Sequence, residues 1–193
     1  MGAKDMLLKK DPREKHLALL FEYGHTIGHA LELTNGVSTS HGEGVAVGML
    51  AASFIANKMG IMSDTDRSDH DAIVVALDPE IFFPDRDIID EVLEKVCHDN
   101  KRGYISERDG FCPFILCKRI GEMHAPNEFY LEYVPVELVR EAIIYVVTRM
   151  SKIAPKAVAS IADDTIEVPK RPRRVSSPET VTDIILSNFQ SCK

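Results

Sequence analysis

Three histidines, His25, His29 and His41, are the residues of this sequence whose types and spacing point most directly to chemistry. His25 and His29 are four residues apart, which puts both on one face of a helix, and a histidine on a following helix can reach the same point. Imidazole nitrogen suits a borderline divalent ion such as zinc, and a catalytic site uses three protein ligands with one position open. The spacing therefore predicts a metal site, although no acidic residue at a fixed spacing completes the ligand set.

Glycines accompany all three histidines. They are Gly24, Gly28, Gly42, Gly44 and Gly48. Each glycine destabilises a helix by roughly 1 kcal/mol relative to alanine, so we expect that a neighbouring backbone or a bound ligand needs the space. Close packing of two helices would explain the glycines but not the three histidines beside them.

Hydrophobic periodicity predicts a mainly helical domain over residues 1–150. The expected helices are 14–34, 43–59, 64–77, 87–98 and 135–150. Two β-like runs, 111–117 and 129–134, are separated by turn residues and predict a small hairpin. The basic and proline-containing composition of 151–193 is typical of a linker and C-terminal tail.

Composition narrows the class of protein. The 193 residues have a net charge of −7, and 45% of them are hydrophobic, which allows one buried core. An acidic chain is a poor partner for nucleic acid, and no apolar run approaches the roughly 18 residues of a membrane span. No signal-like segment is present, and the four cysteines follow neither a zinc spacing nor a disulfide framework. We therefore expect free thiols and a cytoplasmic location.

The sequence around the histidines resembles a known family. Residues 22–30 read Glu-Tyr-Gly-His-Thr-Ile-Gly-His-Ala, and residues 41–49 read His-Gly-Glu-Gly-Val-Ala-Val-Gly-Met. Pattern and separation are both similar to the helical C-terminal domain of the sugar phosphate cyclases, the family of dehydroquinate synthase. The resemblance covers about residues 3–150 and implies a mainly α, multi-helix dehydroquinate synthase-like fold with a small β-hairpin.

Two positions make the sequence resemble the 2-deoxy-scyllo-inosose synthase branch of the family. Dehydroquinate synthases have an asparagine and an arginine where this sequence has Glu22 and Ala18. An arginine can clamp a substrate carboxylate, whereas a glutamate would repel it and accept hydrogen bonds from sugar hydroxyls. The alternative is that Glu22 only pairs with Lys15 or Arg13 on the helix surface.

This branch converts D-glucose 6-phosphate to 2-deoxy-scyllo-inosose with release of phosphate. The resemblance thus implies a carbon–oxygen lyase that depends on NAD and a metal ion and serves aminoglycoside antibiotic biosynthesis. The substrate partner is a hexose phosphate.

The resemblance also implies roles for the histidines. His25 and His41 correspond to ligands of the metal ion, zinc or cobalt, and His29 corresponds to a catalytic histidine that binds substrate. The third ligand of the family is a glutamate on an earlier segment, which no residue here matches. With two ligands, the expected site is incomplete.

Four charged residues also belong to the implied active site. Catalytic positions of the family correspond to Glu22, Lys4 and Glu14, and the lysine at position 4 also contacts the substrate in the family. Lys101 falls where the family has a lysine that binds the substrate phosphate. The alternative for Lys4, Glu14 and Lys101 is a solvated surface charge.

No residue is assigned to cofactor binding. A dinucleotide needs a glycine-rich turn between a strand and a helix, and this sequence has none. The sequence begins almost at the Lys4 position, so we expect an N-terminal NAD-binding domain to be missing from it and the chain to be inactive without that domain. For the full-length protein the resemblance implies a homodimer.

Three other functions stay open: a 3-dehydroquinate synthase, a non-catalytic helical partner module, and a glycerol dehydrogenase-like metal-dependent oxidoreductase. The spacing over 22–49 is more typical of the cyclases than of glycerol dehydrogenase. The presence of His25, His29, His41 and Lys101 favours retained chemistry over a purely structural module.

Overall fold

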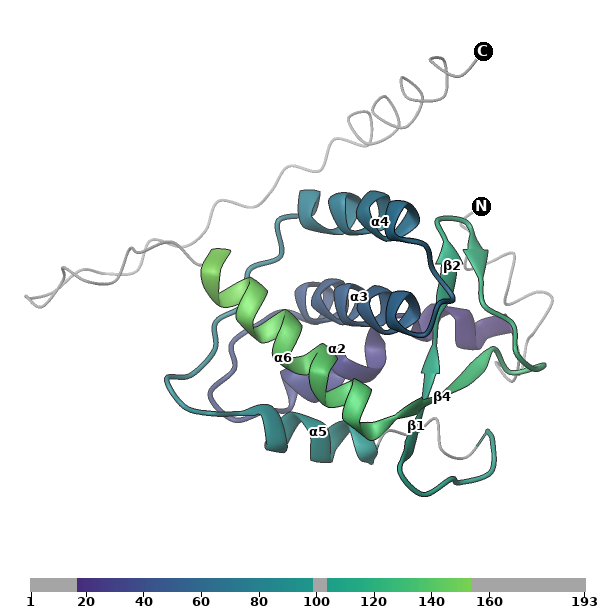
Figure 1. The fold of residues 1–193 in the computed structure, drawn as a ribbon. Helices are drawn as coiled ribbons and strands as arrows, with labels where there is room; N and C mark the ends of the chain where they lie inside the picture. The colour runs from purple at the N-terminus through teal and green to yellow at the C-terminus, as the bar shows by residue number, and fades with distance from the viewer. Residues whose placement is uncertain (1–16, 99–103, 154–193) are drawn as a thin grey trace, which may run out of the picture. The chain divides into compact units, whose positions relative to one another are not determined.

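The structure is a computed structural model that describes residues 17–98 and 104–153 (Figure 1). Its helices are η1 (a 3₁₀ helix, Leu17–Glu22), α2 (His25–Glu32), α3 (His41–Lys58), α4 (Asp64–Ala76), α5 (Ile89–Cys97) and α6 (Val136–Ile153). Its strands are β1 (Phe111–Ile115), β2 (Cys117–Arg119), β3 (Glu122–Met123) and β4 (Leu131–Pro135). The expected mainly helical fold with a small β part is confirmed.

Helix α3 lies at the centre of this fold. It contacts α2, α4 and α6, and α5 packs on α2 and α6 (Figure 1). The side chains of Val47, Leu50, Ala51 and Ile55 are fully buried, as expected for a helix that is apolar on almost every side. None of the described helices combines the length with the hydropathy that crossing a bilayer would require.

The β part is more elaborate than a single hairpin. Strand β1 pairs antiparallel with β4, from Phe111 opposite Pro135 to Ile115 opposite Leu131. The short pair β2–β3 is inserted between them, and Gly121, with φ of 82°, forms its turn. The expected pairing of 111–117 with 129–134 is therefore confirmed for β1 and β4, but 111–117 is not one strand.

The prediction of one helix over 14–34 is wrong. Residues 17–22 form η1, and the chain breaks at Gly24 before α2 begins. Gly24 has φ of 82°, a left-handed conformation that a residue with a side chain rarely adopts. A Cβ there would also lie 2.7 Å from the carbonyl oxygen of Val45, so the break lets α3 approach.

The other predicted helices agree with the structure to within three residues at each end. Helix α3 begins at His41, two residues before the expected start, because Ser40 caps it. The Ser40 hydroxyl accepts a hydrogen bond from the backbone N–H of Glu43, and the Glu43 carboxylate accepts one from the N–H of Ser40. Helix α6 continues to Ile153, and the remainder of the expected 151–193 tail lies outside the described residues.

Glycines bring α2 and α3 into backbone contact. A Cβ on Gly28 would lie 2.9 Å from the carbonyl oxygen of Gly44, and a Cβ on Gly48 would overlap the carbonyl oxygen of Gly24. The expectation that the glycines make room for a neighbouring backbone is confirmed at these four positions. At Gly42 a Cβ would meet no atom within 4 Å, so no neighbouring backbone explains that glycine.

A buried polar network ties the central helices to the turn before α2. The Tyr23 hydroxyl lies 3.0 Å from Nε2 of His70, whose Nδ1 lies 3.1 Å from the carboxylate of Asp71. The same carboxylate accepts hydrogen bonds from Ser53 of α3, at 2.6 Å, and from Arg149 of α6, at 3.1 Å. Three helices therefore meet at one acid.

The network keeps Asp71 ionised. Burial by itself would raise the pKa of Asp71, but hydrogen bonds from His70 and Ser53 and the positive charges of Arg149 and Arg67 outweigh it. The pKa therefore lies below its usual value. The ionised form of Asp71 stabilises the fold.

Substitution at the glycine contacts should separate backbone packing from helix propensity. Gly48→Ala should lower the free energy of unfolding by about 3 kcal/mol, because its Cβ forces the two helices apart. Gly42→Ala is the matched control and should lose no stability, since it faces open space and alanine favours a helix. Urea denaturation measures both; equal losses would contradict the contact.

Asp71→Asn should lower the free energy of unfolding by about 2–3 kcal/mol at pH 7, since it leaves two arginines without their carboxylate. Because the folded pKa is depressed, this difference is complete above the unfolded pKa of about 4 and disappears as pH falls through the folded value. Thermal unfolding between pH 7 and pH 2 measures it. Asp69→Asn, an exposed neighbour on α4, is the control; a loss that does not change with pH would contradict the role of the charge.

Candidate metal centre

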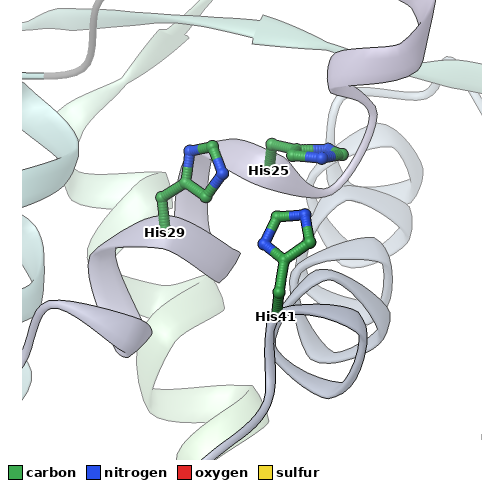
Figure 2. Close-up of side chains that lie close together, drawn as sticks. All are labelled: His25, His29 and His41. Atoms are coloured by element: carbon green, nitrogen blue, oxygen red, sulfur yellow. The ribbon is translucent and has the colours of Figure 1, made fainter.

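The three histidines meet at the junction of α2 and α3 (Figure 2). One ligand nitrogen from each of His25, His29 and His41 lies within 4.8 Å of the other two. The ring centroids are 5.0 to 5.5 Å apart. Within residues 17–98 and 104–153, this is the one group of three or more His, Cys, Asp or Glu side chains that meets in this way.

The local sequence explains why the rings converge. The left-handed Gly24 starts α2 so that His25 is its first residue, and His29 follows one turn later on the same face. The capping box at Ser40 makes His41 the first residue of α3. Because glycines let the two helices touch, the first turn of α3 lies beside the face of α2 that carries the other two imidazoles.

Hydrogen bonds assign the tautomers of two of the imidazoles. Nδ1 of His25 lies 3.3 Å from the carbonyl oxygen of Tyr23, and Nδ1 of His41 lies 2.9 Å from Oε1 of Glu32. Both oxygens only accept, so each Nδ1 carries a proton, and in the neutral ring Nε2 then keeps its lone pair. The donor set thus fits a borderline divalent ion.

The electrostatics at His25 favour the neutral imidazole that a metal needs. Burial lowers the pKa of His25, and the neighbouring His29 and His41 lower it further, although the charge of Glu22 and the hydrogen bond to Tyr23 act in the opposite direction. A depressed pKa means that protons compete less with a metal ion at neutral pH.

His29 joins the group that the sequence analysis limited to two ligands. One of its nitrogens lies within 4.8 Å of a nitrogen of each of the other two, so the described residues supply three nitrogen donors. No carboxylate is part of the group within the described residues. The assignments of His25 and His41 as ligands and of His29 as a catalytic, substrate-binding residue stay predictions.

Of the other predicted site residues, only Glu22 is described. It ends η1, three residues before His25, and is close enough to act on the pKa of that imidazole. Lys4, Glu14 and Lys101 lie outside the described residues, and so do both surface partners considered for Glu22.

The sequence analysis missed Glu32. This residue ends α2, and its carboxylate contacts His41. The signal was available, because Glu32 is three residues after His29 and seven after His25, which places it on the same helix face.

The described residues offer no pyrophosphate site of the usual kind for NAD. Such a site needs a glycine-rich turn between a strand and the N-terminus of a helix. The one described strand that leads directly into a helix is β4, and it enters α6 at Val136 without a glycine.

The fold is that of a known class of enzyme domain. The family described as 3-dehydroquinate synthase C-terminal matches residues 1–102, more than half of the chain, and the chain belongs to this family.

Two similar curated proteins are 2-deoxy-scyllo-inosose synthases. The Niallia circulans protein is 38% identical over 143 residues, which cover 74% of this chain and 39% of that protein. The Streptomyces ribosidificus protein is 34% identical over 159 residues, which cover 81% of this chain and 40% of that protein. A 3-dehydroquinate synthase of Picosynechococcus is 34% identical over 122 residues, which cover 63% of this chain and 32% of that protein. The chain thus spans about two fifths or less of the length of these relatives.

Solved structures agree with this relationship. A crystal structure of 2-deoxy-scyllo-inosose synthase complexed with carbaglucose-6-phosphate, NAD⁺ and Co²⁺ is 39% identical, with a TM-score of 0.60, and the match covers 69% of this chain and 36% of that one. A second 2-deoxy-scyllo-inosose synthase structure is 33% identical, with a TM-score of 0.56, over 70% of this chain and 34% of that one. The predicted family is confirmed.

A Co²⁺ titration followed by visible absorption should detect the cluster. We expect His25→Ala and His41→Ala each to weaken Co²⁺ binding by at least about 10-fold, because each removes a grouped nitrogen that is assigned to the ion, and we expect a smaller effect of His29→Ala. His98→Ala, an exposed histidine at the end of α5, is the control and should bind as the unsubstituted protein does. Binding that survives all three cluster substitutions would place the ion elsewhere.

Proposed function

We propose that the chain is the metal- and substrate-binding part of a carbocycle-forming sugar phosphate cyclase that converts D-glucose 6-phosphate to 2-deoxy-scyllo-inosose with release of phosphate. The convergence of three imidazoles at the α2–α3 junction, in a chain whose relatives include 2-deoxy-scyllo-inosose synthases, carries this proposal. The reaction class is carbon–oxygen lyase.

His25 and His41 would hold the ion, zinc or cobalt, through Nε2, while Tyr23 and Glu32 fix their Nδ1 protons. When bound, the ion would act as a Lewis acid on a sugar hydroxyl. His29 lies within the same group, where it can contact a substrate hydroxyl held at the ion. A relative bound to Co²⁺ supports this choice of metal.

Glu22 would select the substrate. It lies at the end of η1, where its charge acts on His25, and a carboxylate there accepts hydrogen bonds from sugar hydroxyls and repels a carboxylated substrate. Ala18, in the position of the dehydroquinate synthase arginine, is buried with 9% of its surface exposed. The described part of the site therefore favours a hexose phosphate.

The remaining assignments rest on the family resemblance. Lys4 and Glu14 would take part in catalysis, Lys4 would also contact the substrate, and Lys101 would bind the phosphate. NAD would be bound mainly by an N-terminal domain supplied from outside this sequence, which accords with a match to only 36% of the relative that binds NAD⁺. The complete enzyme would be a homodimer.

A cytoplasmic location and a role in aminoglycoside antibiotic biosynthesis belong to the same proposal. The described cysteines, Cys97, Cys112 and Cys117, form no disulfide with one another, which supports a reducing compartment. The biosynthetic role follows from the proposed product.

A second candidate is 3-dehydroquinate synthase, since one relative at 34% identity has that name. Its substrate carries a carboxylate, so an acid at position 22 and a small buried residue at position 18 weigh against it. The glycerol dehydrogenase-like and non-catalytic alternatives have less support. The chain belongs to the dehydroquinate synthase family, and its three imidazoles lie close enough together to hold a metal ion.

Glu22→Gln tests the substrate assignment in an enzyme completed with the N-terminal part of the Niallia circulans relative. Phosphate release from glucose 6-phosphate should fall by about one to two orders of magnitude, as for the loss of a positioned acid or base. Glu94→Gln, an exposed acid on α5, should leave it unchanged, and the chain alone should release no phosphate.

Three results would overturn this proposal. They are full activity of the Glu22→Gln enzyme, preference of the unsubstituted enzyme for the carboxylated dehydroquinate precursor, and phosphate release by the chain without an NAD-binding domain.

A further inference from the structure

We propose that Glu32 is a positioning residue of the metal centre, which holds His41 in the tautomer and orientation that turn Nε2 toward the other two imidazoles. This inference rests on the proposed metal-binding function. It starts from one contact: Oε1 of Glu32 lies 2.9 Å from Nδ1 of His41. A carboxylate at this distance requires the ring to donate its proton on that side.

Glu32 acts through His41 and not as a ligand. The group of donor atoms that lie within 4.8 Å of one another contains the three histidines and no carboxylate from the described residues. The Glu32 carboxylate thus contacts the cluster through His41 without being part of it. A carboxylate in that position fixes the ring and raises the basicity of the ligand nitrogen.

The backbone of α3 leaves space for this carboxylate. A Cβ on Gly44 would lie 3.3 Å from both Cγ and Oε1 of Glu32, which is tighter than side-chain atoms normally pack. Gly44 therefore accommodates the Glu32 side chain as well as the backbone of Gly28, whose carbonyl oxygen would lie 3.2 Å from the same Cβ. Gly44 therefore takes part both in the contact between α2 and α3 and in placing the Glu32 carboxylate beside His41.

Helix stability does not explain an acid at this position. Glu32 is the last residue of α2, and a negative charge at a helix C-terminus is unfavourable. The N-terminal cap of α3 is already provided by Ser40 with Glu43. The Glu32 side chain is 24% exposed, and its hydrogen bond to His41 is the favourable interaction that an acid makes at this position.

The carboxylate also lies beside the first turn of α3, where a negative charge is favourable. A purely structural role of Glu32 would also fit this position, so the test needs a readout that stability alone would not change. The protonated nitrogen of His41 is such a readout, because ¹⁵N chemical shifts of a neutral imidazole distinguish its two tautomers.

The experiment uses metal-free, ¹⁵N-labelled protein at a pH where the imidazoles are neutral. In the unsubstituted protein His41 should be protonated on Nδ1, whereas in Glu32→Ala the population should shift toward the Nε2-protonated form. Co²⁺ titration should then show about 10- to 100-fold weaker binding for Glu32→Ala. Glu32→Gln keeps an acceptor oxygen without the charge and should lose less. Glu94→Gln is the matched control for loss of a surface charge.

Each outcome decides the proposal. An unchanged His41 tautomer together with an unchanged Co²⁺ affinity in Glu32→Ala would overturn it. This holds even if the thermal midpoint of the variant falls. If Glu32→Ala does not fold, the same comparison is made with Glu32→Gln. If the unsubstituted protein binds no Co²⁺, the proposed function fails, while the tautomer measurement still reports whether Glu32 positions the ring.

Discussion

The backbone contact between α2 and α3 is the constraint on which the rest of the described structure depends. Two pairs of glycines, Gly24 with Gly48 and Gly28 with Gly44, allow the carbonyl groups of one helix to approach the other more closely than any side chain permits. This contact fixes the separation of the helix faces that carry the histidines. The spacing of the three imidazoles therefore comes from main-chain packing, which is more rigid than packing between flexible side chains.

Much of this arrangement could be predicted from the sequence. The four-residue spacing of His25 and His29 and the glycines around them are local signals, and the helix boundaries follow from hydrophobic periodicity. The break at Gly24 could not be predicted in the same way, because the reason for it is Val45 on another helix. Similarly, the open position of Gly42 and the inserted β2–β3 pair depend on which neighbours the fold supplies.

The candidate site, like the fold, could be predicted from the sequence only in part. Residue types and spacing indicated imidazole ligands, but the entry of His29 into the group and the contact between Glu32 and His41 depend on the orientation of α3 against α2. Tyr23 adds a link of a different kind, because its carbonyl oxygen orients His25 while its hydroxyl belongs to the Asp71 network. The interior of the helical domain and the histidine cluster are thereby joined through one residue.

All three imidazoles come from one short segment, between His25 and His41. Contacts between residues so close along a chain require little loop-closure entropy, so the segment can assemble early in folding and with little help from distant parts of the sequence. The cluster is in this respect formed by one contiguous segment of the chain. Evolution could retain it on a separate polypeptide, or exchange it between related enzymes, without rebuilding the ligand geometry.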